Sequence, residues 1–356
     1  MAKNFSTMTP DASERSHSAL QEWFERVPKV ELHIHLEGAI PLPALWELMK
    51  KYGGDPEVRS IEDLRRRFEY RDFTHFIQTW IWKNRFIREY EDFEFIGEAI
   101  ANELKRQNIL YAEAFYAPPN HTRKGRLQTG RITEAFRQGL SRVRGIEVNL
   151  IADLVRDLGP QAAERTLMEV HEVRGFGVIG IGIGGTENEY PPYLFKKVYE
   201  KARNLGFRTT AHAGEIADAD SIWGAIRELR VERIGHGTRA MNDDSLIEYL
   251  RQKRIPIEMC PISNVCTGSI ASIKDHPIRH FYDAGLVVFV NTDDPAMFNT
   301  SMAREFSVLH EVHGFTPDEI RKLIINAAES SWLPDNYKRL LLQKLITHPD
   351  WRSEAK

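Results

Sequence analysis

Cysteine is scarce in this sequence, which has only two, Cys260 and Cys266, among 356 residues. Two cysteines cannot form the disulfide framework of a small secreted protein, and such usage is typical of a reducing compartment. Long apolar runs are absent too, so no segment is expected to cross a membrane. Residues 1–18 are polar and lack the apolar core of a signal peptide. We therefore expect a cytoplasmic protein without a membrane partner.

An excess of positive charge is also missing, because 48 basic residues face 51 acidic ones and the net charge is -3. The short basic run Arg65–Arg67 lies among acidic and aromatic residues, as in a solvated helix face, so no nucleic-acid partner is expected. A hydrophobic fraction of 42% suffices for one large core. We predict a flexible tail over residues 1–20 and one domain over 21–350, whose oligomeric state the sequence leaves open.

Short apolar runs typical of strands alternate with amphipathic patterns typical of helices. The expected strands are 30–35, 109–116, 148–154, 178–183, 208–212, 233–235, 256–260 and 287–291. Strands that alternate with helices pair in parallel through right-handed crossovers, and eight of them favour a single (β/α)8 barrel of the TIM type. The alternative, an open doubly wound sheet, usually carries a glycine-rich phosphate turn after its first strand, and none follows residue 35.

We expect extra helices after the first strand and at the C-terminus. The connection over residues 38–108 is long and holds several helical patterns, as lids and substrate-binding insertions do. Residues from Ser301 onward have helical patterns, with Thr316 as one N-cap. The glycine-rich stretch 180–185 follows a strand but does not precede a helix with a lysine, so it is not expected to bind phosphate.

Polar residues gather where five of the expected strands end, and the active sites of barrels form at these ends. They are His33 and His35 after the first strand, His212 and Glu215 after the fifth, His236 after the sixth, Ser263 and Asn264 after the seventh, and Asp293 and Asp294 after the eighth. Each could by itself be a turn, a cap or a structural histidine. Their joint occurrence at matching strand ends predicts one site.

Three histidines and one aspartate supply the nitrogen and oxygen donors that suit zinc. Residues two apart in a strand point to the same face, so His33 and His35 can reach one ion. With His212 and Asp293 they are our candidate ligands for one zinc ion. Because zinc lowers the pKa of a bound water toward neutrality, this set predicts hydrolytic attack by a metal-bound hydroxide, without specifying the bond.

Three further polar residues at these strand ends are not needed as ligands, so they are free for catalysis. Glu215 is the candidate proton donor, and His236 is the candidate base or orienting group. Asp294 adjoins a ligand and is placed to bind substrate beside the metal.

The segments HIHLEGAI, HAGE, ERIGHGT, CPISNVCTG and NTDDP, in this order, resemble the adenosine deaminase family of the amidohydrolase superfamily. The resemblance covers about Lys29 to Phe298, and the helical tail to about Leu345 also fits. It implies that residues 21–350 form a metal-dependent deaminase barrel with one zinc. It also implies hydrolytic removal of the amino group of a 6-aminopurine.

The resemblance assigns roles residue by residue. His33, His35, His212 and Asp293 match the zinc ligands. Glu215 matches the acid that donates a proton toward purine N1, and His236 matches the histidine that orients or deprotonates the water. Asp294 matches the aspartate that hydrogen-bonds N7. Gly185 matches the glycine whose backbone N–H reaches N3.

Two departures from the family pattern concern the substrate. Many adenosine deaminases have aspartate where this chain has Glu37, at a position that faces the ribose 5'-hydroxyl. The adenine deaminase branch tends to carry glutamate there and a pair like Ser263-Asn264. The segment after residue 178 usually has acidic residues where Gly182 and Thr186 stand here.

A loosely aligned hydrophobic gate is a third point of resemblance. Its residues also have the spacing of plain helix core. They are Phe73, Phe76, Ile77 and Trp80.

The resulting prediction is deamination of adenosine or 2'-deoxyadenosine to inosine or 2'-deoxyinosine plus ammonia. The alternatives are an adenine deaminase or a deaminase of another 6-aminopurine compound, such as aminodeoxyfutalosine or an N6-substituted adenylate. A phosphate-bearing substrate would call for basic residues near the rim, with Arg156 and Arg239 as candidates. A catalytically inactive binding relative is the alternative of another class, and it predicts loss of a ligand or of the acid.

Overall fold

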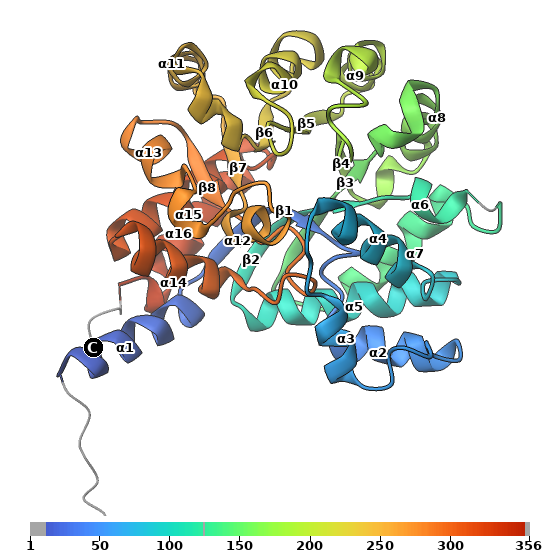
Figure 1. Ribbon diagram of the computed structural model, residues 1–356, viewed down its shortest axis with the longest axis horizontal. Helices are drawn as coiled ribbons and strands as arrows, with labels where there is room; N and C mark the ends of the chain where they lie inside the picture. Colours follow the sequence, from blue (N-terminus) through green and yellow to red (C-terminus); the bar gives the residue numbers. More distant parts are fainter. Residues whose placement is uncertain (1–11, 124, 353–356) are drawn as a thin grey trace, which may run out of the picture.

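The structure is a computed structural model that describes residues 12–123 and 125–352. Its centre is a sheet of eight parallel strands that pair in chain order, and helices surround it (Figure 1). The strands are β1 Lys29–His35, β2 Ile109–Tyr116, β3 Glu147–Asp153, β4 Val178–Gly182, β5 Arg208–Ala213, β6 Arg233–His236, β7 Ile257–Met259 and β8 Val288–Val290. Every predicted strand end lies within one residue of the observed end.

Contacts between β8 and β1 nearly close the sheet into a barrel. The His35 amide donates to the Asp293 carbonyl at 2.8 Å, and the Asp293 amide donates to the His33 carbonyl at 3.1 Å. Asn291 strengthens this seam, because its side-chain oxygen accepts the amides of Leu32 and His33. The predicted (β/α)8 barrel is confirmed, and its seam carries three of the candidate metal ligands.

Helices cover the outside of the barrel and connect successive strands (Figure 1). They are α1 Ala12–Arg26, α2 Leu42–Lys51, α3 Ile61–Arg67, α4 Phe73–Asn84, α5 Tyr90–Arg106, α6 Pro119–Thr122, α7 Thr129–Ser141, α8 Gly159–Glu172, α9 Lys196–Asn204, α10 Ala219–Gly224, α11 Asp244–Lys253, α12 Pro261–Cys266, α13 Ile278–Asp283, α14 Met302–His313, α15 Pro317–Ser330 and α16 Asp335–Thr347. The extra helices predicted after the first strand are α2–α5, and those predicted at the C-terminus are α14–α16. Thr316 caps α15 as predicted, in a reciprocal pair with Glu319.

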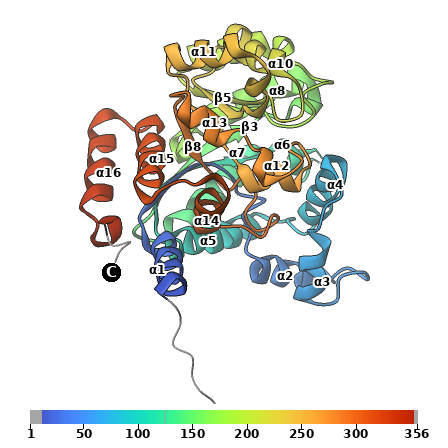
Figure 2. The same ribbon diagram turned by 60° about the vertical axis from the view of Figure 1, so that its left-hand side comes forward.

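The amino-terminal helix corrects one prediction. The flexible tail was expected to reach residue 20, yet α1 begins at Ala12, and residues 1–11 lie outside the described residues. Trp23 and Phe24 are fully buried, and Trp23 Nε1 donates to the Asp350 carbonyl at 2.8 Å. These contacts pack α1 against α14 and the carboxyl-terminal segment (Figure 2). The predicted tail thus overlaps α1 over residues 12–20, and for residues 1–11 it stays a prediction.

Two remaining expectations concern the chain as a whole. Both cysteines are free, so no disulfide links them. In the part of the chain that the structure describes, no helix combines the length and the hydropathy that a membrane span requires.

Candidate active site

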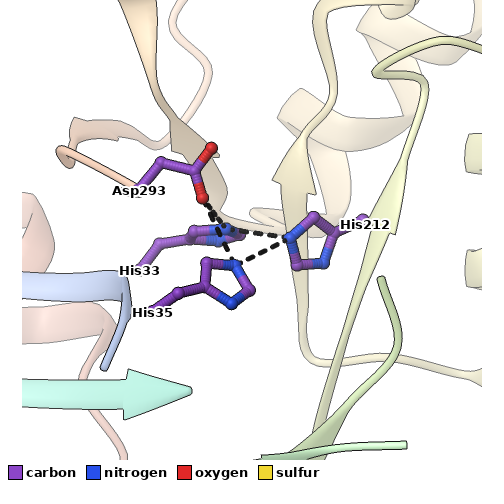
Figure 3. A group of neighbouring side chains, drawn as sticks. All are labelled: His33, His35, His212 and Asp293. Carbon is purple, nitrogen blue, oxygen red and sulfur yellow. Dashed lines mark hydrogen bonds and ion pairs between the residues drawn. The ribbon is translucent and has the colours of Figure 1, made fainter. Parts of the chain in front are cut away.

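Four side chains meet at the carboxyl-terminal end of the barrel strands (Figure 3). His33 and His35 come from β1, His212 comes from β5, and Asp293 follows β8. His212 Nε2 lies 3.1 Å from His33 Nε2 and 3.2 Å from His35 Nε2. Asp293 Oδ1 lies 3.3 Å from His35 Nε2 and 3.5 Å from His33 Nε2. All four residues are buried, and they are the four ligands that the sequence predicts.

The spacing of these atoms fits one zinc ion. Zinc binds imidazole nitrogen at about 2.0–2.1 Å in a tetrahedron, which puts ligand atoms about 3.3 Å apart. The four distances given above are 3.1–3.5 Å, and all four donor atoms lie within 4.8 Å of one another. Three imidazole nitrogens and one carboxylate oxygen, all buried, thus converge on one point as the ligands of a zinc ion do. The chain therefore has a site for one zinc ion.

Charge at this site also favours a cation. Burial alone would lower the pKa of His33, but hydrogen bonds with Asp293 and Glu258 raise it to about 10. Burial and the neighbouring histidines lower the pKa of His212 well below its usual value, so this ring is neutral. Hydrogen bonds to His33 and His35 overcome burial and hold the pKa of Asp293 well below its usual range. The cluster thus attracts positive charge and offers an ionised carboxylate to it.

The ligands are oriented by residues behind them. Glu258 Oε2 lies 2.6 Å from His33 Nδ1, and Arg233 binds Glu258 Oε1 at 2.6 Å. The Ser263 hydroxyl donates to Asp293 Oδ2 at 2.6 Å. Such partners fix the ring orientation of a metal-binding histidine. The sequence analysis missed Glu258, although an acidic residue inside a short apolar strand was the signal for it.

His236 lies beside the ligands at the end of β6. The Asn264 amide nitrogen lies 3.1 Å from His236 Nδ1, and the Asn264 oxygen lies 3.2 Å from Nε2 of buried His276. In this orientation of its amide group, Asn264 donates a hydrogen bond to His236 Nδ1. The ring proton of neutral His236 is therefore on Nε2. Burial lowers the pKa of His236 to about 3, so the ring is neutral and presents an Nε2–H donor. His276 is a second residue that the sequence analysis missed.

Glu215 lies beside His236, with its Oε2 3.6 Å from His236 Nε2. Its side chain is buried, and burial, followed by the charges of Asp293 and Glu187, raises its pKa well above the usual value. Burial thus favours the protonated form of this carboxyl group, which is the form that a proton donor requires.

The Asp294 side chain packs against Gly38, in the turn that follows β1. A Cβ built on Gly38 would lie 1.6 Å from Asp294 Oδ1, so only glycine fits there. Burial and the adjacent Asp293 raise the pKa of Asp294 above its usual value. Its Oδ1 is buried and has no hydrogen-bond partner among the described residues. Asp294 itself lines the cavity, so its carboxyl group can meet a ligand there.

A cavity of about 950 Å³ opens beside these groups. His35, His212, Glu215, His236, Asp293 and Asp294 line one side, which we call the metal wall. Five apolar residues of α4 line another side, which we call the α4 wall: Phe73, Phe76, Ile77, Trp80 and Ile81. The four predicted gate residues therefore do line the cavity. Phe76 is also buried and stacks on Phe298, so the helix-core interpretation is true of it as well.

Gly185 lies in the cavity wall as expected. Its φ is +113, and a Cβ there would lie 1.8 Å from Asp157 Oδ2, so the position requires glycine. The backbone can consequently approach a ligand closely at this point.

Glu37 is placed differently from the substrate-binding residues. It does not line the cavity, because its Oε1 accepts the Ala117 amide at 2.9 Å and lies 3.4 Å from His121 Nε2. Its backbone carbonyl accepts a hydrogen bond from Lys83 Nζ at 2.7 Å. In this structure Glu37 supports the segment after β2, and a contact with substrate stays a prediction.

The two candidate phosphate-binding arginines are both engaged elsewhere. Arg156 is buried and donates to the His212 carbonyl at 2.6 Å, and Arg239 donates to the Ser269 carbonyl at 2.8 Å. Both arginines thus bind backbone carbonyl groups in this structure.

Cys260 lies near enough to His33 and His236 to suggest a second metal-binding group. This group shares His33 with the first one and has only three members, and burial raises the pKa of the Cys260 thiol well above its usual value. A neutral thiol is a poor ligand, so the four-residue cluster is the better site.

Comparisons with known proteins agree with this geometry. The family model described as "Adenosine deaminase" matches residues 28–348. The adenine deaminase of Bordetella parapertussis is 34% identical over 314 residues, covering 87% of this chain and 98% of the relative. The aminodeoxyfutalosine deaminase of Streptomyces avermitilis is 32% identical over 334 residues, covering 92% of this chain and 93% of the relative. A solved amidohydrolase from Burkholderia ambifaria with bound Zn is 26% identical and has a TM-score of 0.86, covering 98% of this chain and 96% of that one.

Proposed function

Because the chain belongs to the adenosine deaminase family of the amidohydrolase superfamily, we propose that it hydrolyses the C6 amino group of a purine in a zinc-dependent reaction. The preferred substrate is adenine, with hypoxanthine and ammonia as products. The sequence analysis placed adenosine first and adenine among its alternatives. The relatives support the alternatives, since one is named adenine deaminase and the other aminodeoxyfutalosine deaminase.

The observation that carries the reaction is the convergence of a metal site, a protonated acid and a neutral histidine on one cavity. His33, His35, His212 and Asp293 would hold the zinc ion. Zinc bound there supplies a Lewis acid that makes water nucleophilic at neutral pH. All four ligands and Glu215 are present, which argues against an inactive binding relative.

The protein's own residues handle the purine. Glu215 donates its proton to N1, which removes electron density from the ring and favours attack at C6. His236 donates from Nε2 and orients the attacking water. The C6–O bond forms and the C6–N bond breaks. One hydrogen of the water restores the proton that Glu215 gave to N1. The other joins the departing amino group, which leaves as ammonia. The Asp294 carboxyl group and the Gly185 amide contact N7 and N3.

The charge of the cavity bears on the choice of substrate. Among the lining residues that the structure describes, Arg123 is the one arginine or lysine. A phosphate is usually bound by a cluster of basic groups, and a single arginine does not provide one. This supports an uncharged purine over an adenylate.

The α4 wall supports a second candidate. It adds five apolar side chains to the cavity, besides the polar groups that would hold the purine ring. A 6-aminopurine with a bulky group on N9, of the kind named for the Streptomyces avermitilis relative, is therefore the runner-up.

Ammonia release from zinc-loaded protein tests both proposals. Adenine, adenosine, 2'-deoxyadenosine, AMP and aminodeoxyfutalosine are compared by kcat/KM. We expect adenine to lead and AMP to be poorest. A lead for aminodeoxyfutalosine would select the second candidate, whereas a lead for AMP would contradict the charge argument. No release from any of them would refute the proposed function.

A further inference from the structure

Glu187 is a buried carboxylate in the loop after β4 that the chemistry above does not use. It is 1% exposed and accepts four hydrogen bonds from the loop after β5 and from α10. Its Oε2 accepts the Gly214 amide at 2.8 Å and the Ser221 hydroxyl at 2.5 Å. Its Oε1 accepts the Glu215 amide at 2.9 Å and the Ile216 amide at 3.1 Å.

Each of these four partners of Glu187 donates a hydrogen. A carboxylate offers acceptors on both oxygens, whereas a glutamine side chain would turn an NH2 group toward N–H donors. Hydrogen bonds to an ionised group are also stronger than neutral ones. The position therefore needs a carboxylate and not only a polar residue of the same size.

The opposite side of this peptide segment is held as well. The Gly214 carbonyl accepts the Thr238 hydroxyl at 2.8 Å and the Arg239 amide at 3.1 Å. Gly214 has a φ of +68, and a Cβ there would lie 2.5 Å from Ile222 Cδ1. The backbone from which the Glu215 side chain enters the cavity is thus restrained on both faces.

Glu187 also joins two segments that face the cavity. It follows Gly185 by two residues in the chain, and it binds the backbone of Glu215 from the next loop. Gly185 and Glu215 both line the cavity, and in the proposed reaction they contact different atoms of the same purine ring. The spacing between these two contacts depends on the carboxylate of Glu187.

We propose that Glu187 is a positioning residue, which holds the Glu215 backbone at the distance from Gly185 that proton donation to the purine requires. This inference rests on the proposed function and deepens it. A catalytic group displaced by about 1 Å can lose about a hundredfold in rate. The loss should fall on kcat, because Glu215 acts in the transition state and the other purine contacts remain.

The test compares Glu187→Gln with Asp243→Asn. Asp243 is a matched control, because its carboxylate also accepts two backbone amides, those of Ser245 and Leu246, and a serine hydroxyl. It does not line the cavity. Both variants are compared with the wild type in zinc content, kcat, KM and hydrogen exchange of the amides at 214–216.

We expect Glu187→Gln to lower kcat about 10- to 100-fold with KM changed less than about threefold. Zinc content should stay unchanged, and exchange at 214–216 should accelerate. Asp243→Asn should leave kcat within about twofold. An unchanged kcat in Glu187→Gln, or equal losses in both variants, would overturn the proposal.

Two outcomes need separate handling. If Glu187→Gln does not fold, Glu187→Asp carries the same test, because it keeps the charge but is one methylene shorter. If the wild type is inactive on every purine, the proposed function fails. Hydrogen exchange alone then tests whether Glu187 restrains the backbone at 214–216. Faster exchange at 214–216 in Glu187→Gln then supports the restraint, and unchanged exchange refutes it.

Discussion

The metal wall and the α4 wall of the cavity are held in place by different forces. On the metal wall, polar atoms are fixed by hydrogen bonds from α12, as in His236 with Asn264 and Asp293 with Ser263. On the α4 wall, apolar side chains of one helix are held by packing, and Ile81 is 61% exposed. Directional bonds suit groups whose position must be accurate for chemistry, whereas packing tolerates substitution. The metal wall should therefore determine the reaction, and the α4 wall should select among purines.

The largest effect is expected from Asp293→Ala. The change removes the carboxylate that compensates the charge of the ion, so zinc should be lost and kcat/KM should fall by more than about a thousandfold. Elemental analysis and ammonia release measure the two effects. A variant that stays fully loaded with zinc would show that Asp293 is not a ligand.

Glu215→Gln should separate chemistry from metal binding on the same wall. The amide keeps the size but cannot deliver a proton, so kcat should fall about 10²- to 10⁴-fold while zinc is retained. The measurement is kcat together with metal content. Turnover close to that of the wild type would refute the proton-donor assignment.

Gly38→Ala tests the accuracy that the metal wall needs. The new methyl group would overlap Asp294 Oδ1, at 1.6 Å, and must displace that carboxyl group. We expect kcat/KM to fall about 10- to 100-fold with zinc retained. Gly175→Ala is the control, since nothing lies within 4 Å of a Cβ there. Equal activity of the two variants would contradict the packing argument.

Ile81→Ala tests the α4 wall. This side chain lines the cavity while largely exposed, so stability should change little. The ratio of kcat/KM between an N9-substituted purine and adenine should shift about three- to tenfold, since one lost apolar contact has that magnitude. Zinc content and kcat for adenine should not change. A shift in metal content instead would show that the two walls are not independent.

The smallest effect is expected from Cys260→Ser. Its thiol is buried near His33 and His236, but it is not needed by the four-ligand site. Zinc content should stay within about 10% of the wild-type value, as judged by elemental analysis. Loss of zinc would mean that the alternative group with Cys260 is the true site.

Prediction from sequence succeeded where a local pattern implies its own geometry. The alternation of His33 and His35 in a strand placed both rings on one face, and the repeated strand and helix patterns implied the barrel. It did not predict that α1 begins at Ala12, a helix that is packed through contacts such as Trp23 with Asp350, more than 300 residues away. It also missed Glu258, His276 and Glu187, because each acts on a residue of another loop or strand, and no local spacing shows such a pairing.

The amino-acid order by itself determined which groups stand at the strand ends, and therefore the set of metal-binding side chains and the family. Only the tertiary structure decided which polar atoms are satisfied and which face the cavity. Glu37 is turned toward Ala117 and Arg156 toward the His212 carbonyl, and Asp294 Oδ1 has no hydrogen-bond partner among residues 12–123 and 125–352. The reason is physical: local sequence sets backbone geometry, whereas burial and hydrogen bonding depend on segments that meet only after the barrel closes.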